Sequence, residues 1–413
     1  MTKKSDAPAI RFKGFSDAWE QRKLGELVDR VVRKNTNNES TLPLTISAQY
    51  GLVDQITYFN NRVASRDVSN YYLVLNGEFA YNKSTSDGYP FGAVKRLDLY
   101  EKGVLSTLYI VFAPKKEQQI DSDYLTVFFD TDRWHKGVAE RAAEGARNHG
   151  LLNISAEDFF DIDLSVPKDI VEQKQIGAFI RQLDNLITLH QRKFEKLTNV
   201  KKSMLEKMFP QNGSSYPEIR FKGFTDPWEQ RKVSDLAEKT YGGGTPTTSN
   251  EAYWNGDIPW IQSSDVVDGK LLGVEPRKWI TQDGLNNSAA QLIPGNSIAI
   301  ITRVGVGKLA FMPYSYATSQ DFLSLSKLNA EPLFTVYACY KKLQSELNAV
   351  QGTSIKGITK DELLAKNIMV PRYAEQQQIG VFFKQLDHLI TLHQRELEKL
   401  QNIKKSMLEK MFV

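Results

Sequence analysis

The sequence predicts an α+β fold: two mixed α/β globular domains separated by two long antiparallel coiled-coil helices, in a pseudo-twofold tandem repeat. Three observations predict it. A short motif opens each half of the 413-residue chain, a nearly identical helical segment closes each half, and the sequences between them are unrelated. A chain of this length commonly forms two or three domains, so this organisation fits its size.

The opening motifs define where each repeat starts. The sequence Ile-Arg-Phe-Lys-Gly-Phe at residues 10–15 recurs at residues 219–224. Trp-Glu-Gln-Arg-Lys at residues 19–23 recurs at residues 228–232, with the same offset. A period this long indicates duplication of a whole unit and excludes a solenoid of short repeats.

The closing segments are nearly identical in the two halves, whereas the middles are not. Residues 175–209 recur as residues 378–412, with 27 of 35 positions identical. Residues 24–165 and 233–369 share almost no sequence. Each half therefore combines a constant frame with a variable middle.

The constant closing segments are predicted to be helices. Their apolar residues recur at steps of three and four, which places them on one face of an α-helix. About 37 residues at 1.5 Å each give a helix roughly 55 Å long. Such a helix needs a partner to bury its narrow apolar stripe, and the other copy can provide it in an antiparallel pair. The residues expected in the pairing face are Leu183, Leu186, Ile187, Leu197, Leu386, Leu389, Ile390 and Leu400.

Prolines mark the expected domain boundaries. Pro210 ends the first helix, and a Val-Pro pair precedes each helix, because proline disfavours helix in the residue before it. The expected segments are a first globular domain at 1–167, a helix at 168–209, a linker at 210–217, a second globular domain at 218–371 and a helix at 372–413.

Both variable middles combine strand and helix signals. Runs of β-branched and aromatic residues, bounded by glycine turns such as Asn76-Gly77, predict strands. Strands are expected at 71–75, 105–112, 297–302 and 322–326, and helices at 122–143 and 332–350. Each middle is therefore expected to form a mixed α/β domain of about 140 residues.

Composition limits the class of protein. The net charge is +4, which permits a nucleic-acid partner without requiring one. No run of 18 apolar residues exists, so no membrane span is expected, and the N-terminus lacks the apolar stretch of a signal peptide. The single cysteine, Cys339, excludes an internal disulfide and is expected to be a small buried residue. We therefore expect a cytoplasmic protein.

Motifs for catalysis are missing. The run Gly305-Val-Gly-Lys308 resembles part of a phosphate loop, but Thr302 occupies the first glycine position and Leu309 follows the lysine. The five histidines have no metal-ligand spacing, and His190 and His393 are equivalent positions of the repeat. We expect no catalytic residue, no metal site and no cofactor in this chain.

Basic and amide side chains in turns of both middles suggest DNA reading. Arginine and lysine can bridge guanine, asparagine can pair with adenine, and hydroxyl groups bind phosphates. The alternative is that these are ordinary solvated turn residues. The candidates are Asn82, Lys83, Ser84, Lys95, Arg96, Arg147, Asn148, Thr245, Thr247, Arg303, Lys308 and Lys356.

The frame resembles a known family. The opening motifs, a variable middle, and then Val-Pro followed by Glu-Gln-x-Gln-Ile-Gly and Leu-Asp-x-Leu-Ile-Thr-Leu-His-Gln-Arg look like the DNA specificity subunit of a bacterial type I restriction-modification system. The run Gly-Gly-Gly-Thr-Pro at 242–246, with Ile-Pro-Trp at 258–260, resembles the opening of many target recognition domains of that family. The first domain lacks this run.

The resemblance implies a non-catalytic subunit that binds double-stranded DNA. Each target recognition domain would read one half of a bipartite target, and the helices would act as the spacer. It also implies two adenine methyltransferase subunits, which use S-adenosylmethionine, and restriction subunits that use ATP and Mg to translocate and cleave DNA.

Two other classes of protein are alternatives to this one. A stand-alone methyltransferase or nuclease would require a cofactor-binding or catalytic motif, and none is found. A coiled-coil interaction scaffold without DNA specificity is the alternative that the repeat itself permits. Salt dependence separates it, because a protein that contacts phosphates loses affinity steeply as salt rises.

Overall fold

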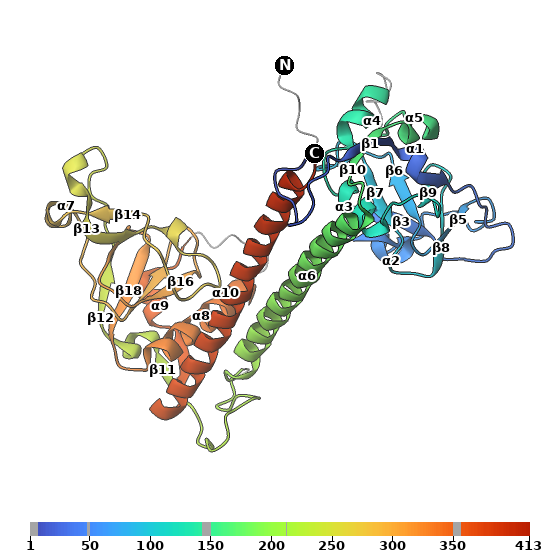
Figure 1. Ribbon diagram of the computed structural model, residues 1–413. Coiled ribbons are helices and arrows are strands. Elements are labelled where there is room, and N and C mark those ends of the chain that lie inside the picture. Colours follow the sequence, from blue (N-terminus) through green and yellow to red (C-terminus); the bar gives the residue numbers. More distant parts are fainter. Residues whose placement is uncertain (1–6, 48–49, 143–149, 212, 350–356) are drawn as a thin grey trace. The chain divides into compact units, whose positions relative to one another are not determined.

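The structure is a computed structural model, and it describes residues 7–47, 50–142, 150–211, 213–349 and 357–413. The chain divides into two compact units (Figure 1). Unit 1 comprises Met1–Leu189 and Leu397–Val413, and unit 2 comprises His190–Glu396. Each unit therefore contains one globular domain, the first part of the helix that follows it and the last part of the other long helix.

The two long helices are present as predicted. Helix α6 spans Ile170–Lys207 and helix α10 spans Tyr373–Lys410, each with 38 residues. Asp169 starts α6 by accepting a hydrogen bond from the backbone N–H of Val171 (2.7 Å), which satisfies one of the free donors at a helix N-terminus.

The helices run antiparallel within each unit. In unit 2, Nδ1 of His190 lies 3.2 Å from Nδ1 of His393, and Lys201 pairs with Asp387 at 2.5 Å. Residue numbers thus rise along α6 while they fall along α10. In unit 1, Lys404 Nζ pairs with Asp184 at 2.6 Å.

The pairing face is narrower than the sequence pattern indicated. Leu183 and Leu386 are buried, while Leu186 and Leu389 are 42% and 40% exposed. A step of three residues rotates Leu186 by about 60° away from Leu183, on the side opposite to Ile187. The expectation that Leu186 and Leu389 pack in the pairing face is therefore corrected. The other expected members are half-buried, namely Ile187, Leu197, Ile390 and Leu400.

Unit 1 surrounds its core with small sheets. Strand β1 pairs antiparallel with β10, a four-stranded sheet has the order β2-β9-β6-β7, and β3-β4 and β5-β8 are two-stranded. Its strands are β1 (Glu20–Lys23), β2 (Val28–Arg30), β3 (Leu44–Ser47), β4 (Gly51–Asp54), β5 (Tyr72–Leu75), β6 (Phe79–Asn82), β7 (Ala93–Arg96), β8 (Lys102–Leu105), β9 (Ile110–Pro114) and β10 (Asp163–Val166). Its short helices are α1 (Leu24–Leu27), α2 (Gln55–Phe59), α3 (Ser122–Phe129), α4 (His135–Arg141) and α5 (Ala156–Phe160).

Unit 2 has the same frame and an equivalent four-stranded sheet, but its remaining strands are arranged differently. Strand β11 pairs antiparallel with β19, and the domain adds a four-stranded sheet, β12-β18-β15-β16, and a three-stranded sheet, β14-β13-β17. Its strands are β11 (Glu229–Lys232), β12 (Ala237–Gly242), β13 (Trp254–Ile261), β14 (Lys278–Ile280), β15 (Ser297–Ile301), β16 (Leu309–Met312), β17 (Ala317–Thr318), β18 (Phe322–Leu328) and β19 (Asn367–Val370). Its helices are α7 (Gln282–Asn286), α8 (Pro332–Ala349), α9 (Lys360–Leu364) and the 3-10 helices η2 (Val233–Leu236), η3 (Glu251–Tyr253) and η4 (Ser263–Asp265).

Two expected elements of unit 1 are interrupted. The expected strand at 105–112 is broken into β8 and β9 by a turn, in which the N–H of Tyr109 donates to the carbonyl of Ser106 (3.2 Å). The expected helix at 122–143 is split into α3 and α4. Between them, the Thr131 hydroxyl donates to the carbonyl of Phe128 (2.6 Å) and so ends α3, as hydroxyl side chains do when they compete with the helical backbone.

The constant frame makes the same contacts in both units. Arg11 forms a two-pronged salt bridge with buried Glu172 (2.6 and 2.8 Å), and its repeat equivalent Arg220 does the same with Glu375 (2.8 and 2.8 Å). Such bidentate geometry is among the stronger charge-assisted contacts, so it fixes each opening motif on the first turns of the helix that follows.

Each core is closed by the last residues of a long helix. Phe412, at the end of α10, packs against Trp19 in unit 1 (ring centroids 6.1 Å apart). Phe209, at the end of α6, packs against Trp228 in unit 2 (5.9 Å). Each globular domain therefore holds the end of the helix that belongs to the other repeat.

Candidate nucleic-acid interface

Two of the candidate cations in unit 1 are bound internally. Lys95 Nζ pairs with Asp130 at 2.7 Å. Arg96, whose side chain is only 8% exposed, pairs with Asp98 at 2.7 Å and with Asp123 at 2.8 Å. These bonds tie β7 to α3 and neutralise both cations, so they argue against base contacts from Lys95 and Arg96.

The turn after β6 holds three further candidates. Lys83 Nζ donates to the carbonyl of Ile154 (3.3 Å), and Asn82 Oδ1 accepts from the N–H of Ser84 (3.0 Å). Lys83 and Asn82 are half-buried, and Ser84 is exposed. The turn thus has a fixed shape that presents the Ser84 hydroxyl to solvent. Three other candidates, Arg147, Asn148 and Lys356, lie outside the described residues.

In unit 2 the candidate Arg303 is presented by a glycine-containing turn. Gly305 and Gly307 have φ values of +94° and +93°, which side chains rarely adopt. A Cβ on Gly307 would lie 2.2 Å from Leu347 Cδ1, so the turn also packs tightly on α8. Arg303 is exposed and forms no ion pair with any residue that the structure describes, whereas Lys308 is half-buried.

The Gly-Gly-Gly-Thr-Pro run packs against the Ile-Pro-Trp run. Trp260 Nε1 donates to the carbonyl of Gly244 (2.9 Å), and a Cβ on Gly243 would lie 1.8 Å from the carbonyl oxygen of Ser319. The candidates Thr245 and Thr247 are exposed, and the Thr245 hydroxyl donates to Gln320 Oε1 (2.6 Å). The glycines are therefore needed for close backbone packing, which displays the threonines at the surface.

Sequence reasoning missed a pair of cations at the edge of this domain. Lys278 is the first residue of β14, and Arg277 directly precedes it. The Lys278 ammonium sits over the rings of Trp254 and Trp260, 5.6 and 5.8 Å from their centroids. Arg277 lies 3.4 Å from the carboxylate of buried Asp265. The only sequence signal was an adjacent basic pair followed directly by Trp279, a pattern suited to nucleic acid.

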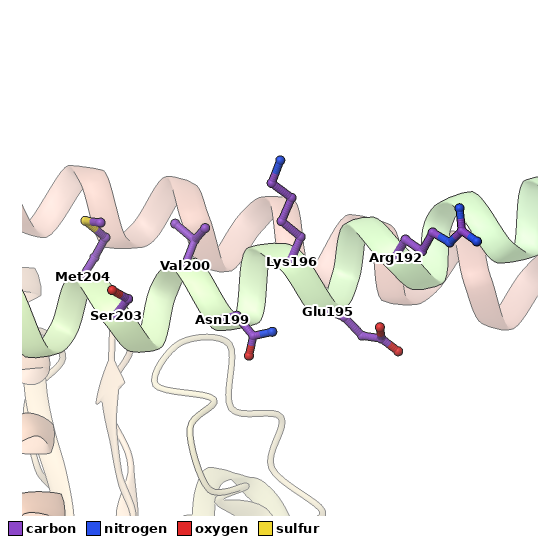
Figure 2. Close-up of a pocket in the computed structure, with 7 residues that line it drawn as sticks. All are labelled: Arg192, Glu195, Lys196, Asn199, Val200, Ser203 and Met204. Atoms are coloured by element: carbon purple, nitrogen blue, oxygen red, sulfur yellow. The ribbon is translucent and has the colours of Figure 1, made fainter. Parts of the chain in front are cut away.

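A shallow groove runs along the second half of α6, within unit 2 (Figure 2). Its volume is about 520 Å³. Figure 2 shows its residues on successive turns of the helix. They are Arg192, Glu195, Lys196, Asn199, Val200, Ser203 and Met204. All except Val200, which is matched by Ile403, recur unchanged at the equivalent positions of α10, so the surface is a repeated part of the frame.

No candidate for catalysis emerges from the described residues. None of their histidine, cysteine and carboxylate side chains form a group of three that could hold a metal ion. Cys339 is buried, and burial raises the pKa of its thiol to about 12, so it is not a reactive nucleophile. His190 and His393 face one another between the paired helices. Within the same part of the chain, no helix is long and apolar enough to cross a bilayer.

Comparisons with known proteins agree with this architecture. The family described as the type I restriction modification DNA specificity domain matches residues 17–199 and again 225–402. The putative type I restriction enzyme MjaX specificity subunit of Methanocaldococcus jannaschii is 22% identical over 410 residues, which cover 94% of this chain and 92% of that protein. The E. coli EcoR124I/EcoR124II specificity subunit is 31% identical over 159 residues, or 37% of this chain and 39% of that protein. The MjaIX specificity subunit of M. jannaschii is 28% identical over 193 residues, and this chain spans 44% of its length.

Solved structures show the same fold. The type I restriction-modification S subunit from M. genitalium has a TM-score of 0.60 with 13% identity, covering 98% of this chain and 99% of that one. A chain from a structural study of complex assembly in the type I restriction-modification system has a TM-score of 0.50 with 16% identity, covering 95% and 97%. Since the specificity domain matches most of the chain in two copies, the protein belongs to the family of DNA specificity subunits of type I restriction-modification systems.

Proposed function

We propose that each globular domain reads one half of a bipartite DNA target. The observation that carries this proposal is the contrast between a constant frame and two unrelated middles. A frame that repeats would place two readers in equivalent positions, and readers with different sequences and different smaller sheets would recognise different bases. The two half-sites would then differ in sequence, as the two domains do.

The available cations support reading from surface turns. Arg303 is exposed and held on a turn with two left-handed glycines, so its backbone can approach a duplex closely. Arginine bridges the O6 and N7 atoms of guanine in the major groove, which is the commonest specific contact between proteins and DNA. Ser84, Thr245 and Thr247 are exposed hydroxyls suited to phosphate oxygens.

The repeated groove of α6 supports docking of two copies of one partner. Its basic residues Arg192 and Lys196 and its apolar residue Val200 recur, identical or conservatively replaced, in α10. Identical surfaces fit identical partners, whatever target the middles read. We infer that the partners are two adenine methyltransferase subunits, joined by restriction subunits in a cytoplasmic complex. S-adenosylmethionine, ATP and Mg would be bound by those subunits, and this chain would make and break no bonds itself.

The paired helices would set the gap between the two half-sites. Each helix is continuous over 38 residues, and each contributes to both compact units. A helix rises 1.5 Å per residue and resists bending when it is paired along its length, so its length can act as a ruler.

A domain exchange tests the division of labour. Residues 24–165 would be replaced by the corresponding segment of another specificity subunit, and modified adenines would be mapped in a host that expresses the complete complex. One half-site should change completely, while the other half-site and the gap stay the same. A change in both halves would exclude the assignment of one domain to one half-site. The salt dependence of DNA binding by the unaltered complex is measured as well. If its affinity for DNA did not fall as the salt concentration rises, an interaction scaffold would be favoured instead.

A matched insertion tests the ruler. Seven residues would be inserted after His190 and seven after His393, because these positions face each other and a seven-residue insertion keeps the apolar stripe in phase. Each helix gains about 10 Å, or roughly three base pairs at 3.4 Å each. The gap should lengthen while both half-sites keep their bases. A variant in one helix only is the control, and it should lose binding because the pairing loses its register.

A further inference from the structure

The edge of the second recognition domain carries an arginine in an unusual setting. Arg277 directly precedes β14, which is one of the two edge strands of the sheet β14-β13-β17. Its side chain is 65% exposed, whereas the carboxylate beside it, Asp265, has a side-chain exposure of 0%. A solvated cation is therefore placed against a completely buried anion.

The buried carboxylate of Asp265 stabilises the position of this arginine. Its Oδ2 accepts the backbone N–H of Gln262 (3.0 Å), and its Oδ1 has no hydrogen-bond partner among the described residues. A buried carboxylate needs a countercharge, and Arg277 Nε at 3.4 Å is the cation that pairs with it. The carbonyl of Ser264 also accepts from Arg277 Nη2 (3.4 Å). One edge of the guanidinium is thus restrained by an ion pair and one long hydrogen bond, and the side chain remains 65% exposed.

The neighbouring residues fit a nucleic-acid groove. Side chains alternate along a strand, so Arg277 and Trp279 share one side of β14, while Lys278 lies on the other side over Trp254 and Trp260. Trp279 is 39% exposed opposite Pro259. A restrained arginine beside an exposed aromatic ring combines a directional donor with apolar surface. An antiparallel strand pair is narrow enough to enter the major groove of B-DNA.

We propose that Arg277 reads a guanine in the half-site of the second domain and that Asp265 is its positioning residue. The inference rests on the proposed function, that this domain reads DNA. Restraint of the guanidinium distinguishes base reading from phosphate binding, because a bidentate contact with O6 and N7 requires a fixed plane, whereas a phosphate contact tolerates a mobile charge. Trp279 adds apolar surface for a thymine methyl group beside that guanine.

The test compares Arg277→Ala, Arg277→Lys and Asp265→Asn with the control Lys239→Ala. Each full-length chain would be assembled with its partner subunits, and binding would be measured against a DNA library randomised over both half-sites. Arg277→Ala should weaken binding of the preferred target roughly 5- to 150-fold and abolish preference at one position of one half-site. Arg277→Lys should keep the charge without restoring the preference. Asp265→Asn should reduce the preference at the same position only, with the rest of the profile unchanged.

Different results would overturn the proposal. Uniform weakening by Arg277→Ala across all sequences, with rescue by Arg277→Lys, would identify a phosphate contact instead. If Arg277→Ala had the same base preferences as the wild type, Arg277 would not contact a base. The proposed function would still hold in that case, provided that the wild-type complex prefers particular bases. A wild-type complex without any sequence preference would overturn both. The control Lys239→Ala removes an exposed charge from β12, in the four-stranded sheet of the same domain, and should leave the profile unchanged.

Discussion

The frame and the globular domains differ in how far they repeat. The frame keeps its contacts pair by pair: Arg11 with Glu172 matches Arg220 with Glu375, and Trp19 with Phe412 matches Trp228 with Phe209. The domains share the order of their four-stranded sheets, β2-β9-β6-β7 and β12-β18-β15-β16, but differ in sequence and in their other strands, which form β3-β4 and β5-β8 in unit 1 and β14-β13-β17 in unit 2. Contacts that close each unit therefore depend on the constant ends alone. The middles are left free to vary, which is the arrangement that a family of exchangeable DNA readers requires.

The largest effects are expected where each unit is closed by the end of a helix. Phe412→Ala and Phe209→Ala should each lower the free energy of unfolding by about 3–5 kcal/mol, because each removes a buried ring from an aromatic cluster. Unfolding by denaturant, followed by tryptophan fluorescence, measures this change in the free energy of unfolding. The controls are Leu186→Ala and Leu389→Ala, which remove exposed leucines from the same helices and should change stability by no more than about 0.5 kcal/mol. If the two phenylalanine substitutions lowered the free energy of unfolding by different amounts, the two copies of the frame would not be equivalent.

The repeated salt bridges should give the next largest effect. Arg11→Ala and Arg220→Ala each leave a buried carboxylate, Glu172 or Glu375, without its countercharge, and should cost about 3 kcal/mol. The same unfolding measurement applies. The exposed pair of Lys136 with Glu140 is the control, and Lys136→Ala should be close to neutral. A small effect in one unit only would show that the frame is fixed differently in the two repeats.

Much of the frame could be predicted from the sequence because its signals are periodic and duplicated. The stripe containing Leu183 and Leu386 predicted two helices, and the repeat predicted their pairing. The narrowness of the face, which exposes Leu186 and Leu389, depends on the rotation of each helix about its axis, and a pattern of threes and fours does not specify that rotation.

The candidate site could be predicted much less well. The sequence singled out Lys95 and Arg96 because they are basic and near turns. Asp98 lies only two residues after Arg96, but the other carboxylate partners, Asp130 and Asp123, come from residues far along the chain. Arg277 was missed because Asp265, Trp254 and Trp260 are distant from it in the sequence and are brought near it and Lys278 only by the fold of the domain. Charge is visible in a sequence, whereas internal neutralisation of that charge is a property of the fold.

Substitutions of Arg303 and Arg96 should separate a role in DNA recognition from a role in the stability of the fold. Arg303→Ala should cost about 1–3 kcal/mol of DNA affinity and relax one position of one half-site, with unfolding unchanged, because its side chain is exposed. Arg96→Ala should lower stability by about 1.5–3 kcal/mol, because Asp98 and Asp123 lose a charged donor, and should leave the preferred bases unchanged. Binding to a randomised library and thermal unfolding measure the two effects. The opposite result, specificity lost in Arg96→Ala alone, would reverse the assignment.

The smallest effect is expected where equivalent residues of the two copies meet. The pKa of His393 is lowered by partial burial and by the charges of His190 and Lys193. The unfolded chain, with an ordinary histidine pKa near 6.5, therefore binds protons more readily than the folded chain. Stability from this group is complete above about pH 6.5 and is lost as the pH falls through the lowered pKa.

The pH dependence of unfolding in His393→Gln tests this. Thermal unfolding between about pH 7.5 and 5.5 should show a smaller loss of stability on acidification in His393→Gln than in the wild type. His135 contributes in the same direction in unit 1, since burial lowers its pKa too, so the measured quantity is the difference between variant and wild type. His388→Gln, which changes an exposed histidine on the same helix, is the control. A larger acid sensitivity in His393→Gln would mean that His393 gains a proton on folding, and the facing histidines would then stabilise the helix pair as a charged group instead of a neutral one.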